Sequence, residues 1–143
     1  MASAGSPRSE YTLRRRVHFY ETDAAGIVHF SNFFRYMEEA EHAMWREAGL
    51  SIANRKAPVG FPRIAASFEY HRPLRVEDEF DVCITVVAKS EKTMQYRCVL
   101  TKGDETIATG SLTIVCVSTA EQPMKAIPIP PDIASRFMVA ATQ

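Results

Sequence analysis

Hydrophobic and polar residues follow two different periods in the first third of the chain. Residues 13–20 alternate with a period of two, which predicts a first strand ending near Tyr20. Beyond it, apolar side chains recur at steps of three and four, the spacing of one long amphipathic helix. Ser31 or Asn32 suits the amino-terminal cap of this helix, and Gly49 suits the position just after its end. The pattern therefore predicts a strand followed by a helix.

The period of two returns in the second half of the chain. After a loop at 51–63 that is rich in proline and glycine, alternation predicts four strands, at about residues 64–70, 80–87, 94–101 and 106–117. Short connections join antiparallel neighbours, so the order predicts an α+β fold with a five-stranded antiparallel sheet and one covering helix. Gly110 interrupts the last strand and predicts a bulge or a close approach of backbone there.

The two ends of the chain differ from this central domain. Residues 1–9 are small and polar and lack the apolar core of a signal peptide, so we expect a disordered lead. Residues 10–131 form the domain, and 132–143 form a carboxy-terminal tail with at most one helical turn. Since one helix covers only one face of the sheet, we expect an oligomer.

Composition narrows the class of protein. The 143 residues suit a single domain, and 17 basic against 17 acidic side chains give no reason to expect nucleic acid as a partner. No apolar run approaches the roughly 18 residues of a membrane span. Cys83, Cys98 and Cys116 stand singly, which favours reduced thiols in a cytoplasmic protein over a disulfide framework or a metal site. The successive residues Arg14, Arg15 and Arg16 point to alternate faces of a strand and are expected to be solvent-exposed edge charges.

Chemistry concentrates between the first strand and the helix. Asp23 precedes the small residues Ala24, Ala25 and Gly26, which permit close approach of a ligand. A carboxylate there can act as nucleophile or general base, and amides of residues 29–32 at the helix start can polarise a carbonyl oxygen. The stretch predicts an acyl-transfer site, although Asp23 as a simple turn cap explains the spacing equally well.

These residues resemble a known family. The segment VHFYETDAAGIVHFSNFFRYMEEA (17–40) resembles the signature of the 4-hydroxybenzoyl-CoA thioesterase-like hotdog-fold enzymes, in which (D/E)-T-D-x-x-G-(I/V)-V precedes an Asn-aromatic pair that opens the central helix. FEYHRPLR (68–75) is similar to the family's strand ending in R-P, and GSLTIVCV (110–117) is similar to its last strand. The resemblance covers residues 11–130 and implies the hotdog fold, an antiparallel sheet wrapped around the helix.

The resemblance also implies a function. It implies an acyl-CoA thioesterase that hydrolyses a CoA thioester to free acid and CoA without a cofactor, in dimers or tetramers with active sites at subunit interfaces. Asp23 matches the family's nucleophile or general base, Gly26 its turn glycine, and the Phe30 amide its carbonyl-polarising donor. Two positions depart from the pattern: Glu21 stands where Asp is commoner, and His29 stands where Tyr or Phe is commoner. His29 can contact the substrate or simply form part of the pocket wall.

Substrate contacts and alternatives complete the expectations. Phe33 and Phe61 are candidates for an acyl pocket that favours aromatic groups, and Arg72 is a candidate for the CoA phosphates together with Arg75, Lys89 and Lys92. Competing carboxylates lie on the helix at Glu38, Glu39 and Glu41, where a solvated face is the simpler explanation. Ser31 as a nucleophile would need an adjacent base. A non-catalytic acyl-thioester-binding domain and a hotdog hydratase or dehydratase remain the alternative functions.

Overall fold

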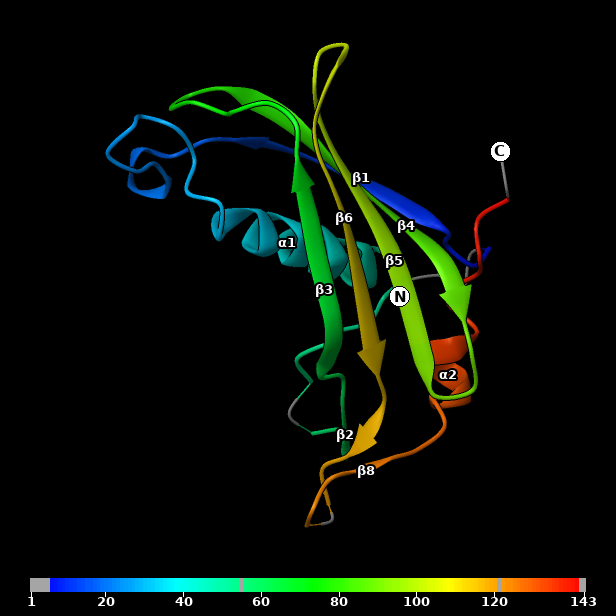
Figure 1. Cartoon of the computed structure of the whole chain (residues 1–143). Coiled ribbons are helices and arrows are strands. Elements are labelled where there is room, and N and C mark those ends of the chain that lie inside the picture. Colours follow the sequence, from blue (N-terminus) through cyan, green and yellow to red (C-terminus); the bar gives the residue numbers. More distant parts are fainter. Residues whose placement is uncertain (1–5, 55, 121, 142–143) are drawn as a thin grey trace.

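A computed structural model describes residues 6–54, 56–120 and 122–141 (Figure 1). It contains a long helix, a short one, a 3-10 turn and eight strands, in the order β1 (Glu10–Arg16), η1 (Phe19–Glu21), α1 (Asn32–Glu47), β2 (Val59–Gly60), β3 (Arg63–Tyr70), β4 (Glu79–Lys89), β5 (Thr93–Lys102), β6 (Glu105–Val115), β7 (Val117–Ser118), β8 (Lys125–Ala126) and α2 (Pro131–Ala134). The predicted long helix and the five predicted strands are all present.

The main sheet has five strands in the order β1-β4-β5-β6-β3, and every neighbouring pair is antiparallel. Figure 1 shows this sheet curving across α1, which lies against one of its faces. A small second sheet, β2-β7-β8, continues from the end of β6. The predicted α+β architecture, with a five-stranded antiparallel sheet wrapped around one helix, is confirmed. In the part of the chain that the structure describes, no helix has the length and hydrophobicity of a membrane span.

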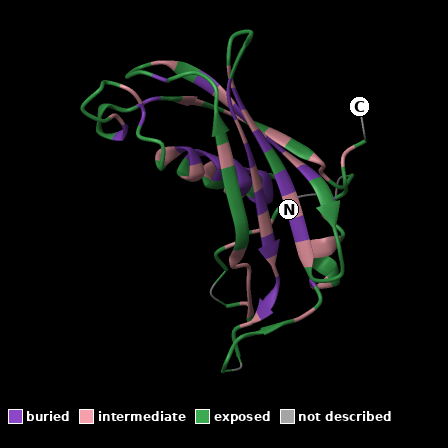
Figure 2. Cartoon of the chain, in the orientation of Figure 1, coloured by how far each residue is buried: buried purple, intermediate pink, exposed green. Residues whose placement is uncertain are grey.

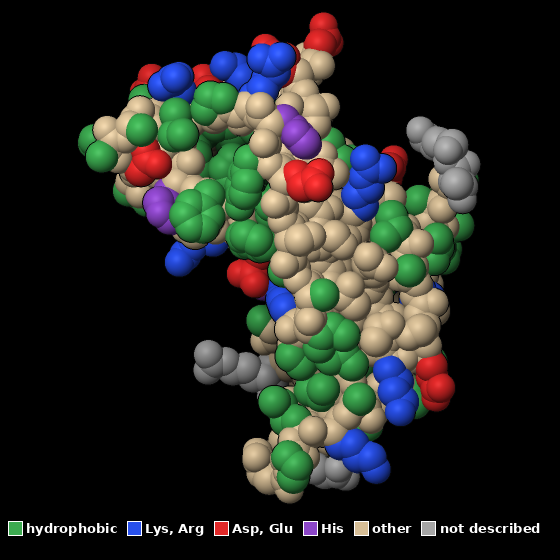
Figure 3. All heavy atoms as spheres, in the orientation of Figure 1, with side chains coloured by type: hydrophobic (Ala, Val, Ile, Leu, Met, Phe, Trp, Pro, Cys, Tyr) green, Lys and Arg blue, Asp and Glu red, His purple; other side chains and the backbone are tan. Residues whose placement is uncertain are grey.

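The sheet and helix bury one shared core. Alternate side chains of β4, β5 and β6 face α1 and are buried, which produces the purple bands in Figure 2. On α1 the buried side chains are Phe33, Tyr36, Met37, Ala40, Glu41, Ala43, Met44 and Trp45. The opposite sheet face stays partly exposed, and Figure 3 shows a broad area without charged side chains in the middle of the molecule. Burial on one face only explains the period of two.

The helix ends as its sequence predicts. Gly49 adopts a positive φ of 81°, and its N–H donates to the Arg46 carbonyl at 2.9 Å. The Leu50 N–H donates to the Trp45 carbonyl at 2.9 Å, and the Leu50 side chain packs against the core. These two bonds form a Schellman motif, which requires a left-handed residue that glycine adopts without strain.

The first strand is shorter than predicted. Pairing with β4 ends at Arg16, and the chain then turns through η1, where the side chains of Phe19 and Tyr20 are 79% and 82% exposed. The alternation of hydrophobic and polar residues in the sequence continues past Arg16, although the chain has already left the sheet there. Sequence periodicity cannot distinguish this turn from strand.

Described residues near both ends of the chain contact the domain. Of the predicted lead at 1–9, residues 1–5 lie outside the described residues, whereas Arg8 pairs with Phe137. Phe137, in the predicted tail at 132–143, is buried and packs on Trp45 with ring centroids 5.1 Å apart. The Lys89 ammonium donates to the carbonyls of Ala134 and Phe137 at 2.7 and 2.8 Å. Lys89 is therefore committed to anchoring this segment in the described structure.

Candidate active site

The turn that carries Asp23 is a tight loop closed by its own backbone. Thr22 and Val28 form an isolated antiparallel bridge, and the Asp23 N–H donates to the Ile27 carbonyl at 2.8 Å. The Gly26 N–H donates to the Asp23 carbonyl at 2.9 Å, with Gly26 at a φ of 79°. Because this φ lies in the left-handed region, glycine is the residue that closes the turn without strain.

The Asp23 carboxylate is only partly engaged by this turn. Its Oδ1 accepts the Ala25 N–H at 2.8 Å, while Oδ2 accepts no hydrogen bond from the described residues. Asp23 thus caps its own turn and still presents a free carboxylate oxygen. The sequence left open whether Asp23 is a catalytic carboxylate or a turn cap, and this geometry is compatible with both roles.

The buried side chain of Glu21 holds the start of the Asp23 turn in place, a role that the sequence analysis did not predict. Its side chain is 5% exposed and accepts hydrogen bonds from the Arg15 guanidinium at 2.6 and 2.8 Å, the His18 N–H at 2.8 Å and the Tyr36 hydroxyl at 3.0 Å. Burial raises the pKa of Glu21, but these donors outweigh burial, and the pKa lies below the usual range. The only available signal was Glu at a position where the family pattern favours Asp.

Arg15 corrects the prediction of three solvent-exposed arginines. Its side chain is 13% exposed, pairs with Glu21 and with Glu39 at 2.6 Å in each case, and lies over the Tyr36 ring at 4.5 Å. Arg14 and Arg16 do remain exposed, as predicted. Arg15 points inward because its side of β1 faces α1. The carboxylates of Glu21 and Glu39 neutralise its charge there.

The amides at the helix start have different partners. The His29 N–H donates to the Glu21 carbonyl, and the Asn32 N–H donates to the His29 carbonyl, both at 2.9 Å. The Ser31 N–H contacts the Nδ1 atom of His29 at 3.3 Å. Of the four amides in residues 29–32, only the Phe30 N–H lacks an acceptor among the described residues. This segment therefore offers one free donor rather than four.

Neither predicted cap residue caps the helix through its side chain. Ser31 Oγ lies 2.7 Å from His29 Nδ1, and the Asn32 side-chain amide donates to the Glu21 carbonyl at 2.8 Å. Both side chains instead fix the segment that precedes α1. The Ser31–His29 distance suits a nucleophile and a base, but neither residue lines the cavity described next.

A hollow of about 430 Å³ opens beside the turn and the start of α1. Its lining combines the carboxylate, aromatic rings and a basic rim: Asp23, Ile27, Val28, Phe30, Phe33, Tyr70, His71, Arg72 and Pro73. In Figure 1 this region lies at the left, where the blue-to-cyan loop enters α1. The fold thus brings four of the predicted site residues together, with Gly26 in the adjoining turn.

Two predicted site residues, His29 and Phe61, do not line this hollow. His29 stacks on the Phe30 ring, with centroids 4.6 Å apart, rather than lining the hollow. Phe61 packs against Trp45 at 5.0 Å, toward the other end of α1. Arg72 does line the hollow, and its exposed guanidinium pairs with Glu105 at 2.8 Å. Tyr70 is a lining residue that sequence reasoning did not select.

The helix carboxylates serve other contacts. Glu41 is completely buried, which corrects its assignment to a solvated face, and pairs with Arg63 at 2.5 Å. Burial raises the pKa of Glu41, and the Arg63 charge offsets this only in part. Glu38, exposed as predicted, pairs with Arg63 at 3.1 Å. None of these carboxylates lines the hollow beside Asp23.

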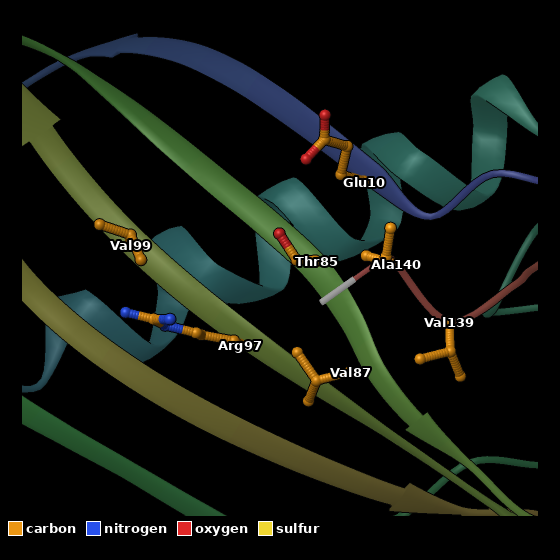
Figure 4. A pocket seen from close by; sticks show the side chains of 8 residues that line it. Glu10, Thr85, Val87, Arg97, Val99, Val139 and Ala140 are labelled. Atoms are coloured by element: carbon orange, nitrogen blue, oxygen red, sulfur yellow. The ribbon is translucent and has the colours of Figure 1, made fainter. Parts of the chain in front are cut away.

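A larger hollow, of about 550 Å³, lies on the sheet face turned away from α1 (Figure 4). Figure 4 shows Thr85, Val87, Arg97 and Val99 projecting from β4 and β5, with α1 behind the sheet. Its lining includes the carboxylate of Glu10 but no helix terminus to hold developing negative charge. Within the described residues no group of three His, Cys, Asp or Glu side chains could hold a metal ion. The hollow beside Asp23 is therefore the better candidate for chemistry.

An antiparallel sheet wrapped around one helix, with a carboxylate turn beside the helix start, defines the class of hotdog-fold thioesterases. The model of the thioesterase-like superfamily matches residues 17–137, and the chain belongs to this family. A putative esterase from Aquifex aeolicus is 38% identical over 99 residues, covering 68% of this chain and 77% of the relative. The chain is accordingly a hydrolase of thioesters, and the resemblance drawn from the sequence is confirmed.

Two further comparisons name substrates for related proteins. A 1,4-dihydroxy-2-naphthoyl-CoA hydrolase from Microcystis aeruginosa is 27% identical over 118 residues, covering 81% of this chain and 84% of its own length. The solved structure of a gentisyl-coenzyme A thioesterase superposes with a TM-score of 0.80 at 26% identity, covering 89% of this chain and 99% of that one. Both names describe aromatic acyl thioesters of coenzyme A.

Proposed function

We propose that this thioesterase hydrolyses acyl-CoA thioesters, with Asp23 as nucleophile or general base and the Phe30 N–H as the donor that polarises the thioester carbonyl. One observation carries the proposal: a carboxylate oxygen and an amide that have no hydrogen-bond partner among the described residues belong to residues that line one hollow. An activated nucleophile and a preorganised donor are the two elements that acyl transfer requires.

The reaction needs no cofactor in this scheme. If Asp23 acts as a base, it takes a proton from water while the water oxygen attacks the carbonyl carbon, and negative charge moves to the carbonyl oxygen beside the Phe30 N–H. Collapse of this intermediate breaks the carbon–sulfur bond, and the CoA sulfur receives the proton from Asp23. If Asp23 instead attacks the carbonyl carbon directly, the carbon–sulfur bond breaks and CoA leaves as the thiolate. Water then hydrolyses the resulting anhydride, which restores the Asp23 carboxylate, and a proton from this water protonates the CoA sulfur. Both routes yield the free acid and CoA.

An aromatic acyl group is the proposed substrate class. The rings of Phe30, Phe33 and Tyr70 line the hollow, and Phe33 meets Tyr70 edge to face at 4.9 Å. Such rings favour flat aromatic groups through offset and edge-to-face contacts. The aromatic acyl groups in the names of the two relatives support the same class. Arg72, at the rim, is a proposed contact for a CoA phosphate.

Turnover is proposed to take place in a homodimer or homotetramer with active sites at subunit interfaces. β3 pairs with β6 along one edge only, and most of its residues are exposed. An unpaired strand edge presents free N–H and C=O groups to a second copy. A second subunit on this edge would lie next to Tyr70 and the hollow, and Phe61 stays a proposed pocket residue in that assembly. Cytoplasmic location also stays a prediction.

The test is a panel of aromatic and aliphatic acyl-CoAs with released thiol as the readout. Asp23→Asn keeps the size of the side chain and removes its charge, so kcat should fall by about 10²-fold or more. Asp104→Asn removes the same charge from an exposed residue next to Gly103 and should behave as wild type. Wild-type kcat in Asp23→Asn would refute the assigned mechanism.

Two other outcomes of the panel separate the alternatives. Tight binding of several acyl-CoAs without thiol release would favour a non-catalytic binding domain. Hydration of an enoyl-CoA, followed by absorbance, would favour a hydratase. Among active substrates, the ranking by kcat/KM decides between aromatic and aliphatic groups.

A further inference from the structure

We propose that Tyr70 is a positioning residue for hydrolysis: its hydroxyl holds the Phe30 segment in the arrangement that keeps the Phe30 N–H available to the thioester oxygen. The inference rests on the proposed function, because it assigns a purpose to Tyr70 only if the Phe30 amide polarises the carbonyl. Tyr70 acts through Phe30 and does not itself contact the reacting atoms.

Tyr70 reaches the helix start from a distant element. It is the last residue of β3, and its hydroxyl donates to the Phe30 carbonyl at 3.0 Å across 40 residues of sequence. Its ring meets the Phe33 ring edge to face, with centroids 4.9 Å apart and planes at 88°. Phe30, Phe33 and Tyr70 all line the hollow that Asp23 enters. The hydroxyl therefore ties the sheet to the segment that carries the free donor.

The residues on either side of Phe30 are fixed by His29, Ser31 and Asn32, but few contacts hold Phe30 itself. Phe30 lies two residues before Asn32, the first residue of α1, and its side chain is 62% exposed. Among the described residues, its ring stacks only on the neighbouring His29. Its carbonyl receives one other hydrogen bond, from the Phe33 N–H at 3.3 Å, which is long for this type of bond. Among the described residues, the Tyr70 hydroxyl is the one group from the sheet that bonds to the Phe30 backbone.

Rigidity at this point matters for the reaction. A donor stabilises an oxyanion strongly only if it is already oriented before charge develops, since reorientation would consume the benefit. Small misplacements near reacting groups cost large factors in rate. The Phe30 N–H belongs to the peptide unit before Phe30, and Tyr70 restrains the peptide unit after it, so the hydroxyl limits the orientation of the donor through the Phe30 backbone.

The Tyr70 hydroxyl is suited to permanent donation. Burial raises the pKa of Tyr70 above its ordinary value, so the hydroxyl keeps its proton at neutral pH. Because that proton is committed to the Phe30 carbonyl, Tyr70 is not free to act as a general acid. A ring without the hydroxyl would still form the aromatic wall, which separates positioning from simple lining.

The first experiment uses Tyr70→Phe, which preserves the ring and removes only the hydroxyl. On the best aromatic acyl-CoA of the panel, kcat should fall by about 5-fold to 30-fold with KM changed less than about 2-fold, because the lost restraint affects the transition state more than the bound substrate. Tyr11→Phe removes a hydroxyl from a partly buried tyrosine on β1, away from the hollow, and should leave both constants unchanged. Thermal unfolding of each variant verifies that the fold is retained.

A second measurement reads the carbonyl directly. Bound to Asp23→Asn, benzoyl-CoA labelled with ¹³C at the carbonyl should show an infrared stretch shifted below its value in water, since the Phe30 N–H polarises the bond. In Asp23→Asn/Tyr70→Phe the stretch should return toward the value in water. If Tyr70 only supported the fold without orienting the Phe30 N–H, the carbonyl stretch would be shifted equally in Asp23→Asn and in the double variant.

The outcomes distinguish this inference from the proposed function. Unchanged kcat in Tyr70→Phe together with a strongly impaired Asp23→Asn overturns the role of Tyr70 and leaves the proposed function standing. A raised KM with unchanged kcat, or an unaltered carbonyl stretch in the double variant, also overturns the positioning role. Full activity in Asp23→Asn overturns the proposed function itself.

Discussion

The contact between Gly110 and Phe68 makes the sharpest stability prediction. The two residues are direct cross-strand partners on β6 and β3. A Cβ atom built on Gly110 would lie 2.6 Å from Cε1 and 2.8 Å from Cδ1 and Cζ of the Phe68 ring. Gly110 pairs in register on both sides, so of the two predicted explanations the close approach applies and the bulge does not. Gly110→Ala therefore forces the ring to move.

The cost follows from what the ring contacts. Phe68 meets Phe34 edge to face at 5.1 Å and Phe33 at 5.9 Å, and each such aromatic pair contributes about 0.5–1.5 kcal/mol. Overpacking typically costs about 1–3 kcal/mol. Phe68 is half-buried and can yield toward solvent, which keeps the expected loss within this range. For a chain of this size the loss corresponds to a fall in Tm of roughly 3–12 °C.

A double-mutant cycle tests the cause. Urea unfolding of wild type, Gly110→Ala, Phe68→Ala and the double variant gives the coupling free energy, expected at about 1–2 kcal/mol. Without the ring, Gly110→Ala should cost little or even stabilise, because alanine restricts the unfolded chain more than glycine does. Ser111→Ala, at the next position of β6, removes the hydroxyl that accepts from the Gln95 side-chain amide at 3.2 Å, and it should cost no more than about 1.5 kcal/mol and the same with and without the Phe68 ring.

The refuting result is plain. If Gly110→Ala unfolds at the same urea concentration as wild type, or if its cost is the same with and without the Phe68 ring, steric contact with that ring is not the reason for glycine. Because Phe33 lines the hollow, a displaced Phe68 should also raise KM for aromatic acyl-CoAs.

Two further predictions concern charge and assembly. Glu21→Gln should lose about 1.5–3 kcal/mol of stability at pH 7, because the charge-assisted hydrogen bonds from Arg15 are weakened. The folded-state pKa of Glu21 lies below the unfolded value of about 4.3, so this stability is present at neutral pH and is lost as the pH falls through the folded-state pKa. Urea unfolding of both proteins from pH 7 downward should show the gap closing, and a constant gap would contradict the assignment. Light scattering should give two or four times the chain mass of 16.1 kDa, and a mass of 16.1 kDa would refute assembly through the β3 edge.

The elements of the fold were predictable because their signals are local. The long helix, its end at Gly49 and the strands β3 to β6 follow from hydrophobic spacing and from turn chemistry within a few residues. The strand at 13–20 was overextended for the same reason, since Phe19 and Tyr20 continue the alternation although the chain has left the sheet. Local pattern does not reveal where a ladder stops.

The candidate site was predictable only in part. Asp23 and Gly26 belong to one turn, and Phe30 lies just before the helix start. A single stretch of sequence therefore identifies all three as candidates. Glu21 looked like a minor departure from a motif, yet it is the buried carboxylate that holds the turn. Tyr70 gave no signal, because its proposed role depends on a hydrogen bond to a residue 40 positions away.

By itself, the sequence determined the order and kind of the elements and placed a carboxylate beside a helix start, since these depend on interactions within a few residues. Only the tertiary structure decided which charges are buried and which donors stay free. Arg15 turns inward to Glu21 and Glu39, and Glu41 meets Arg63, because the packing of the sheet on α1 brings β1 and β3 against the helix carboxylates. The Phe30 N–H is left as the free amide because the neighbouring amides find acceptors on Glu21 and His29, while this one faces no protein acceptor among the described residues.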